Sequence, residues 1–241
     1  MSEYKDSILV LRTYKLGESD RILSCLSKEH GKVRVVAKGA RKPKGKFGGR
    51  IEPFTELNAS LWRGRGELDT LRQVDVISLN SSLHEDLDKM MKAATVVELV
   101  DKVSFDGQEL SELYTLATRA LRLLAQKDSA NFLAVFALRL LVVEGLAPQL
   151  EGCRVCGDRK LTSIEARNGY GLCVVHGVSS PVSTGVIDMM RAVLAGKTAS
   201  VLNLEMMDES VEFEAVVIEY LESVLSLRLA SMHSNDSSLM F

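Results

Sequence analysis

Two pairs of potential metal ligands lie late in the chain. Cys153 and Cys156 are separated by two residues in CRVC, and Cys173 and His176 by two residues in CVVH. Two intervening residues form a tight turn that points both side chains at one ion, and four such ligands complete the tetrahedron that Zn²⁺ prefers. Sixteen residues separate the pairs, a spacing typical of structural zinc sites. The sequence therefore predicts one structural Zn²⁺ per chain, with ordinary buried cysteines and an incidental histidine as the alternative.

The sequence contains no recognisable catalytic motif. A catalytic zinc would need an open coordination position and a neighbouring general base, and neither the HxE pattern of deaminases nor HExxH is present. The chain also contains no KxDG adenylation motif, no GxSxG and no carboxylate cluster of the kind that binds two metal ions in nucleases. We therefore predict no catalytic residues and no enzymatic activity.

A second group of chemically active residues is basic. Eight Lys and Arg side chains and no acidic one lie between positions 32 and 50, centred on GARKPKGKFGGR at 39–50. A field of this sign attracts phosphate polymers or anionic surfaces. The alternative is a solvated basic face that keeps the protein soluble.

The glycines of this segment raise the question of a nucleotide-binding loop. A Walker A loop has four residues before its Gly-Lys and then Ser or Thr, whereas Gly39 and Gly45 enclose five residues and Phe47 replaces the hydroxyl. The segment instead joins two predicted strands, which favours contact with a nucleic-acid backbone. Phe47 either stacks on a base or anchors the loop in the core. The candidate DNA-binding residues are Lys32, Arg34, Lys38, Arg41, Lys42, Lys44, Lys46, Phe47, Arg50, Arg63 and Arg65.

The elements that carry the basic segment are predicted to be strands. Alternating apolar residues and intervening turn residues indicate strands at 7–17, 21–27, 32–39, 51–63 and 67–79. Five strands with no intervening helix suggest a small closed barrel of the OB type. An open meander or an SH3-like barrel fits the pattern almost as well.

From residue 82 the apolar spacing becomes helical. Helices are predicted at 82–103, where Ser82 and Glu85 form a capping box, and at 109–126, 130–144, 183–195 and 209–230. The metal-ligand pairs lie in an irregular insert at 148–180. The predicted fold is α+β: an OB-fold barrel at 1–80, a helical domain at 81–147 and 181–241, and a zinc-finger insert at 148–180.

Composition suggests where the protein works. The longest apolar runs are interrupted by charges, the N-terminal residues carry no signal-peptide core, and the cysteine pattern suits a reducing compartment. We therefore expect a cytoplasmic protein with no membrane contact. The net charge of −2 conceals an asymmetry, because residues 1–79 hold 16 Lys and Arg against 10 Asp and Glu, whereas the remainder holds 14 against 22.

Three segments resemble the bacterial recombination mediator family RecO, over essentially the whole chain. They are YKLGESDRILSCLSKEHGKVRVVAKGARKPKGKFGGRIEPF (14–54), RGRGELDTLRQVD (63–75) and CRVCG. The resemblance implies a nucleoid-associated DNA repair and recombination protein that binds single- and double-stranded DNA and promotes strand annealing. It also implies that the protein acts alongside RecR to help the recombinase RecA replace single-strand binding protein (SSB) on single-stranded DNA.

The same resemblance bears on the remaining sites. The resemblance implies the metal ligands Cys153, Cys156, Cys173 and His176; where members of the family have four cysteines, His176 is a departure, and members without metal exist. The family's contact with the C-terminal tail of SSB lies on the helical part, where Arg119, Arg122, Lys127 and Arg139 are candidates.

Two other functions remain open from the sequence. The chain could be an accessory subunit of a nuclease or ligase that uses the barrel and zinc as binding modules. It could also be a protein-interaction adaptor that binds no nucleic acid.

Overall fold

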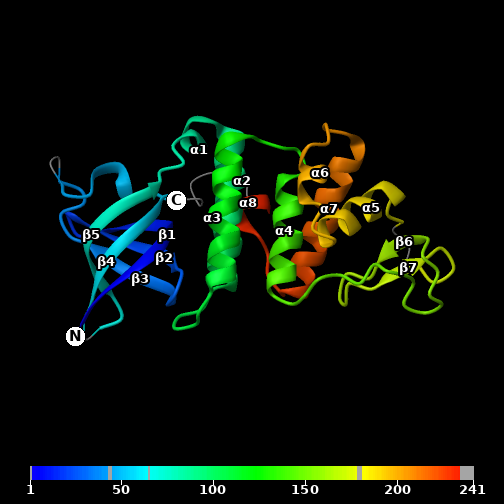
Figure 1. The fold of residues 1–241 in the computed structure, drawn as a ribbon, viewed down its shortest axis with the longest axis horizontal. Helices are drawn as coiled ribbons and strands as arrows, with labels where there is room; N and C mark the ends of the chain where they lie inside the picture. Colours follow the sequence, from blue (N-terminus) through cyan, green and yellow to red (C-terminus); the bar gives the residue numbers. More distant parts are fainter. Residues whose placement is uncertain (1, 43–44, 65, 178–180, 234–241) are drawn as a thin grey trace. The chain divides into compact units, whose positions relative to one another are not determined.

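The computed structural model describes residues 2–42, 45–64, 66–177 and 181–233 (Figure 1). Contacts within the chain define two compact units, one of residues 1–126 with 230–241 and the other of residues 127–229. The three-part domain division at residues 80, 147 and 180 remains a proposal.

The first unit begins with a five-stranded barrel. Its strands are β1 (Ser2–Leu16), β2 (Asp20–Ser27), β3 (Gly31–Ala37), β4 (Glu56–Arg63) and β5 (Asp69–Ser78). The sheet closes in the order β1-β2-β3-β5-β4, with all pairs antiparallel except β3 with β5, which meet at Val35–Asp69 and Val36–Thr70. This is the arrangement of an OB-fold, as the sequence predicted.

Alternation along the strands builds the barrel core. One face of each strand is apolar and points inward, which is the period-2 pattern of a half-buried strand. The buried cluster comprises Ile8, Val10, Leu23, Cys25, Val33, Val35, Ala37, Phe47, Ile51, Leu57, Ala59, Leu61, Leu71 and Val74. Outward positions are consequently free to carry polar and charged groups.

Helices complete the first unit. They are α1 (Ser82–Glu85), α2 (Leu87–Val103), α3 (Ser111–Gln126) and α8 (Ala230–His233). The predicted single helix at 82–103 is wrong, because the backbone of Asp86 is extended and its carboxylate accepts from the N–H groups of Asp88 and Lys89. Asp86 rather than Ser82 therefore caps α2, and the Ser82 hydroxyl donates to the carbonyl of Ala125 instead.

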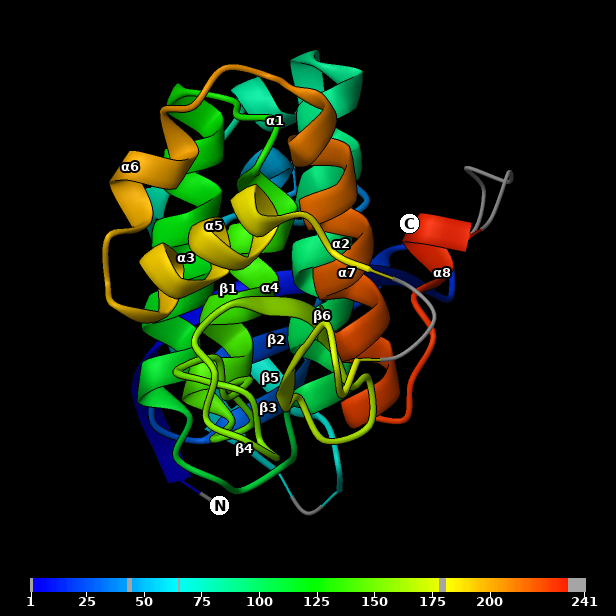
Figure 2. The same ribbon diagram turned by 90° about the vertical axis from the view of Figure 1, so that its right-hand side faces the viewer.

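The second unit is a helical bundle with a small sheet. It contains α4 (Phe132–Val143), α5 (Thr184–Leu194), α6 (Thr198–Leu202), α7 (Asp208–Val224), β6 (Leu161–Ile164) and β7 (Gly171–Cys173). Helix α4 has nine buried residues, which confirms its predicted central place. Strand β6 lies beside α5 (Figure 2). Among the described residues, no helix combines the length and apolarity needed to cross a membrane.

Candidate metal centre and nucleic-acid interface

The four predicted metal ligands converge in the second unit. Their ligand atoms all lie within 4.8 Å of one another. The Sγ atoms of Cys156 and Cys173 are 3.7 Å apart, and Nδ1 of His176 lies 3.6 Å from Sγ of Cys153. A tetrahedron with metal–sulfur bonds of about 2.3 Å and metal–nitrogen bonds of about 2.0 Å separates its ligands by roughly 3.5–3.8 Å. The donor set and its spacing therefore fit a tetrahedral metal ion.

Local backbone structure holds the ligands in place. The N–H of Gly157 donates to the carbonyl of Cys153 at 2.8 Å, and the N–H of His176 donates to the carbonyl of Cys173 at 3.1 Å. Gly157 has φ of 79°, a conformation that glycine adopts without strain. Each ligand pair is thus brought together by a closed turn.

The environment of Cys153 favours a thiolate. Burial raises the pKa of this thiol, but backbone N–H groups of Cys156, Cys173 and Val155 and the ring of His176 outweigh it and lower the pKa to about 6. A thiolate is the form that binds metal ions.

Contacts with α5 fasten the insert to the bundle. The guanidinium of Arg191 donates to the carbonyl oxygens of Leu150, at 2.9 Å, and Arg159, at 2.8 Å. The guanidinium of Arg154, between the first two ligands, lies 4.7 Å from the ring centroid of Tyr170. The four metal ligands were predictable because two short motifs contain all of them, whereas these supporting contacts join distant positions.

The basic segment at 39–50 begins on a fixed support in the first unit. The carboxylate of Asp20 accepts from the N–H of Gly39 at 2.8 Å, and the carbonyl of Ser19 accepts from the N–H of Arg41 at 2.9 Å. The Gly39 N–H and then the Ser19 hydroxyl lower the pKa of Asp20. The β1–β2 turn therefore positions the start of the loop.

Phe47 anchors the other end of the loop. Its side chain is 2% exposed and belongs to the barrel core, which favours the anchoring role of this ring over stacking on a base. The guanidinium of Arg50 donates to the carbonyls of Lys46 and Phe47 and holds the chain in a short turn there. The loop cations are consequently presented by backbone that is fixed at both ends.

The remaining predicted DNA-binding residues differ in availability. Arg34, Lys38, Arg41 and Lys42 are exposed. The ammonium of Lys32 is 2.8 Å from the carboxylate of Asp101 on α2, which makes it a structural ion pair rather than a free cation. Arg63 lies over the ring of Tyr4 at 4.8 Å and 3.9 Å from the carboxylate of Asp69. Lys44 and Arg65 lie outside the described residues.

Sequence reasoning missed two residues near this loop. Trp62 points outward from β4, and Arg72, on β5, places its guanidinium 5.6 Å from the centroid of the indole. The outward position of Trp62 could have been found from the alternation in ELNASLWR, in which Leu57, Ala59 and Leu61 point inward.

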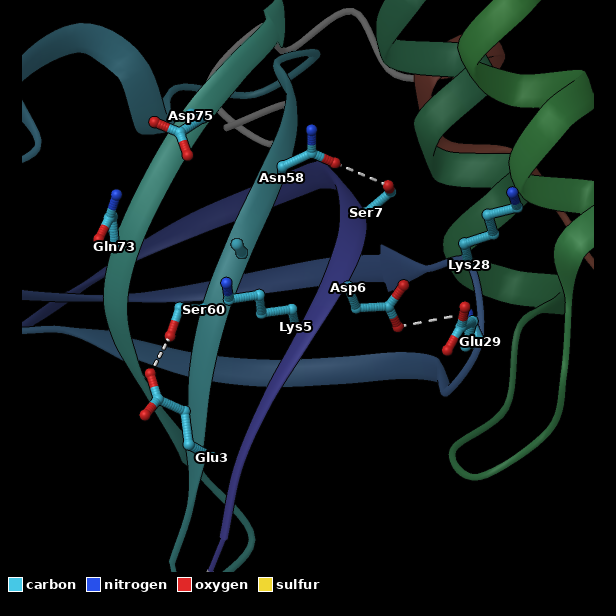
Figure 3. Close-up of a pocket in the computed structure, with 11 residues that line it drawn as sticks. Glu3, Lys5, Asp6, Ser7, Lys28, Glu29, Asn58, Ser60, Gln73 and Asp75 are labelled. Carbon is cyan, nitrogen blue, oxygen red and sulfur yellow. Dashed lines mark hydrogen bonds between the residues drawn. The ribbon is translucent and has the colours of Figure 1, made fainter.

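An open groove crosses the outer faces of β1, β4 and β5, with a volume of about 700 Å³ (Figure 3). Its labelled side chains are mostly polar and include carboxylates, carboxamides, hydroxyls and two ammonium groups. The lining residues are Glu3, Lys5, Asp6, Ser7, Lys28, Glu29, Asn58, Ala59, Ser60, Gln73 and Asp75.

Asp6, which lines this groove, contacts a serine and a histidine. The buried carboxylate of Asp6 accepts from the Ser27 hydroxyl and from the N–H of Glu29 at 3.3 Å, and lies 2.8 Å from Nδ1 of His30. A hydrolytic triad requires the serine hydroxyl to contact the histidine ring, whereas the Ser27 hydroxyl donates to the Asp6 carboxylate and accepts from the backbone N–H of His30 at 3.0 Å. The cluster therefore fastens the β2–β3 turn to β1.

Together these features define a class of protein: an OB-fold barrel with an anchored basic loop, joined to a helical unit with a cysteine–histidine cluster that could hold a metal ion. The comparisons with known proteins agree with that class. The family model described as "Recombination protein O N terminal" matches residues 1–80, and "Recombination protein O C terminal" matches residues 84–233. The chain belongs to this recombination protein O family.

Curated relatives support the assignment. The chain is 36% identical over 177 residues to "DNA repair protein RecO" of Bifidobacterium longum strain DJO10A, covering 72% of this chain and 74% of the relative. It is 35% identical over 211 residues to the protein of the same name from a Nocardioides species, covering 82% and 85%. The corresponding values for Pelotomaculum thermopropionicum are 34% over 200 residues, with 80% and 78% covered.

Proposed function

We propose that this chain binds single- and double-stranded DNA through its barrel and acts as a non-enzymatic mediator of recombinational repair. The observation that carries the proposal is the basic loop, whose exposed cations are held by Asp20 at one end and by buried Phe47 at the other. Membership of the recombination protein O family supports this proposal.

The binding would be electrostatic and independent of sequence. Lys and Arg side chains that neutralise phosphates release counterions, so the logarithm of the affinity falls linearly with the logarithm of the salt concentration. If about five phosphates are neutralised on a single strand, the slope is about −3.5.

Changing Arg34, Lys38 and Lys42 together to Gln tests this proposal. The three side chains are exposed and lie on β3 and in the loop. Losing three phosphate contacts should reduce the slope to about −1.4, as measured by fluorescence anisotropy of a labelled oligonucleotide at several salt concentrations.

A matched variant controls for net charge. Lys160, Arg167 and Lys197 are also exposed but belong to the second unit, and changing them to Gln alters the net charge equally. The control should keep the wild-type slope. An equal loss in both variants, or no loss in the loop variant, would remove the loop from the DNA site.

In the mediator reaction, base pairing would supply the free energy of annealing, and the protein would bring the two complementary strands together. Cations that offset phosphate repulsion allow two complementary strands to approach. We propose that the protein does this on strands covered by SSB, and that together with RecR it promotes the loading of RecA. It would act in the cytoplasm at the nucleoid, where chromosomal DNA lies.

The SSB tail would contact the helices. Among the predicted candidates, Arg119 and Arg122 lie on α3 in the first unit, and Arg122 is 3.7 Å from the carboxylate of Glu56. Lys127 and Arg139 belong to the second unit. Each pair is therefore a separate candidate for the residues that contact the SSB tail.

For the metal centre, we propose a structural Zn²⁺ held by Cys153, Cys156, Cys173 and His176. Three thiolates and one imidazole suit this ion, and four protein ligands leave no position for a substrate. The ion would hold the two turns of the insert together.

A further inference from the structure

A β-bulge interrupts the pairing of β4 with β5. Ser60 lies opposite Gln73 and Leu61 opposite Leu71, so Arg72 is an extra residue on β5. A bulge bends its strand and redirects the side chain of the extra residue. Here it accompanies the placement of the Arg72 guanidinium over the indole of Trp62, 5.6 Å from the ring centroid.

The bulge also connects this pair to the basic loop. The ammonium of Lys46 donates to the carbonyl oxygen of Arg72. Lys46 immediately precedes the buried Phe47, which fixes the loop at this point. Lys46, at the end of the loop, therefore adjoins the Trp62–Arg72 pair.

Trp62 is a neighbour of two residues that line the groove. Glu3 lies opposite Trp62 in the β1–β4 ladder, and Ser60, two residues away on β4, points to the same outer face. Both Glu3 and Ser60 line the groove, and the Ser60 hydroxyl donates to the Glu3 carboxylate. The partly exposed ring is thus continuous with a polar surface.

Charge determines what such a groove can accept. Four carboxylates and two lysines line it, so phosphates are disfavoured inside and favoured at the basic loop. The carboxamides of Asn58 and Gln73 and the hydroxyl of Ser60 are groups that hydrogen-bond to base edges. A single strand would therefore lie with its phosphates at the loop and its bases toward the groove.

We infer that Trp62 and Arg72 form a stacking site for an unpaired base of single-stranded DNA. The inference rests on the proposed DNA binding and adds a strand preference to it. Aromatic rings accept bases whatever their sequence. In a duplex both faces of a base are already covered by its neighbours, so the site selects unpaired DNA.

Fluorescence of the full-length protein tests this directly, because Trp62 is the single tryptophan in the sequence. The probes are an oligothymidylate and an abasic oligomer of equal length, which carry the same phosphates. Stacking of thymine on the indole should quench the emission, whereas the abasic oligomer should leave it nearly unchanged. Equal responses to the two oligomers would overturn the inference without any substitution.

Variants supply the second readout. Trp62→Leu should weaken binding to oligothymidylate by about 5- to 150-fold, the range of one stacked base, and should leave binding to the abasic oligomer unchanged. Trp62→Phe should restore most of the affinity because it keeps a ring. Phe105→Leu is the control, since Phe105 is 62% exposed and lies outside the barrel strands; it should bind both oligomers as the wild type does.

The outcomes separate this inference from the proposed function. Salt-dependent binding that is unaffected by Trp62→Leu overturns the stacking site and leaves DNA binding intact. Failure of the wild type to bind any oligomer with a salt-dependent affinity overturns the proposed function, and the stacking site with it. Selective loss of oligothymidylate binding, with unchanged thermal unfolding of the variant, supports the site.

Discussion

Phe47 lies among lysines and arginines in the sequence, yet its ring is buried in the barrel core. Its contribution should therefore be to stability. Phe47→Ala should destabilise the protein by about 3–5 kcal/mol, the cost typical of emptying a buried aromatic site, and Phe47→Leu should cost less because it refills most of the space. Urea-induced unfolding measures both effects.

The same two variants distinguish anchoring from base contact. Phe47→Leu should bind oligothymidylate about as tightly as the wild type, because the ring touches no base and the loop stays anchored. A stable Phe47→Leu protein that selectively loses oligothymidylate affinity, while binding an abasic oligomer normally, would show that the ring leaves the core to stack.

Individual residues were predictable where their partners are close in sequence. Cys153, Cys156, Cys173 and His176 were found because two-residue spacings specify a local turn, and the structure brings all four together. The pairing of Trp62 with Arg72 was not predictable, because it depends on strand register and on a bulge. Phe47 remained ambiguous in the sequence because exposure depends on which face of the loop meets the core.

The helices and strands were likewise predictable where a local sequence pattern indicates them. Alternating apolar residues predicted all five barrel strands, although β1 begins at Ser2 rather than at residue 7 and β4 at Glu56 rather than at residue 51. The break at Asp86 was missed because the periodicity continues across it, while the extended backbone of one residue separates α1 from α2. Strands β6 and β7 are four and three residues long, too short for a pattern to indicate them.

The insert is the element whose stability should depend on metal. It has two short strands and three exposed valines, Val155, Val174 and Val175, so its own packing is limited. The protein should contain one zinc per chain by atomic absorption. Changing Cys153 and Cys156 to Ser should abolish zinc binding and amide protection at β6 and β7, while protection of the barrel strands persists.

A conservative change at the fourth ligand provides the control. His176→Cys should retain zinc because four thiolates form an equally suitable tetrahedral site. Its amide protection should match that of the wild type. Two results together would contradict the metal site: a wild type without stoichiometric metal, and a Cys153/Cys156 double variant whose insert keeps its amide protection. They would show that ordinary packing holds the cluster together.

On the scale of the whole molecule, charge is segregated along the chain. Residues 1–79 carry a net charge of +6, and the remainder carries −8. If the total charge of −2 were distributed uniformly, no region of the protein would attract DNA electrostatically. We expect this segregation to favour the approach of DNA to residues 1–79, which form the barrel, over its approach to the acidic remainder of the chain.

This segregation leads to a prediction for strand annealing. The wild type should accelerate annealing of complementary strands coated with SSB by at least about tenfold at low salt, because the basic loop offsets phosphate repulsion. The acceleration should vanish near 1 M salt, where the Debye length is about 3 Å. Salt itself favours uncatalysed annealing, so the protein's contribution should fall while the background rises. A fluorescence-quenching assay with donor- and quencher-labelled strands measures both.

The loop and control variants decide whether the barrel causes the acceleration. Arg34, Lys38 and Lys42 lie on β3 and in the loop of the first unit, whereas Lys160, Arg167 and Lys197 lie in the second. Replacing the first set by Gln should remove most of the acceleration, and replacing the second set should leave it intact. Equal acceleration by both variants would mean that total charge, or another surface, brings the strands together; acceleration by neither variant nor wild type would contradict the mediator proposal itself.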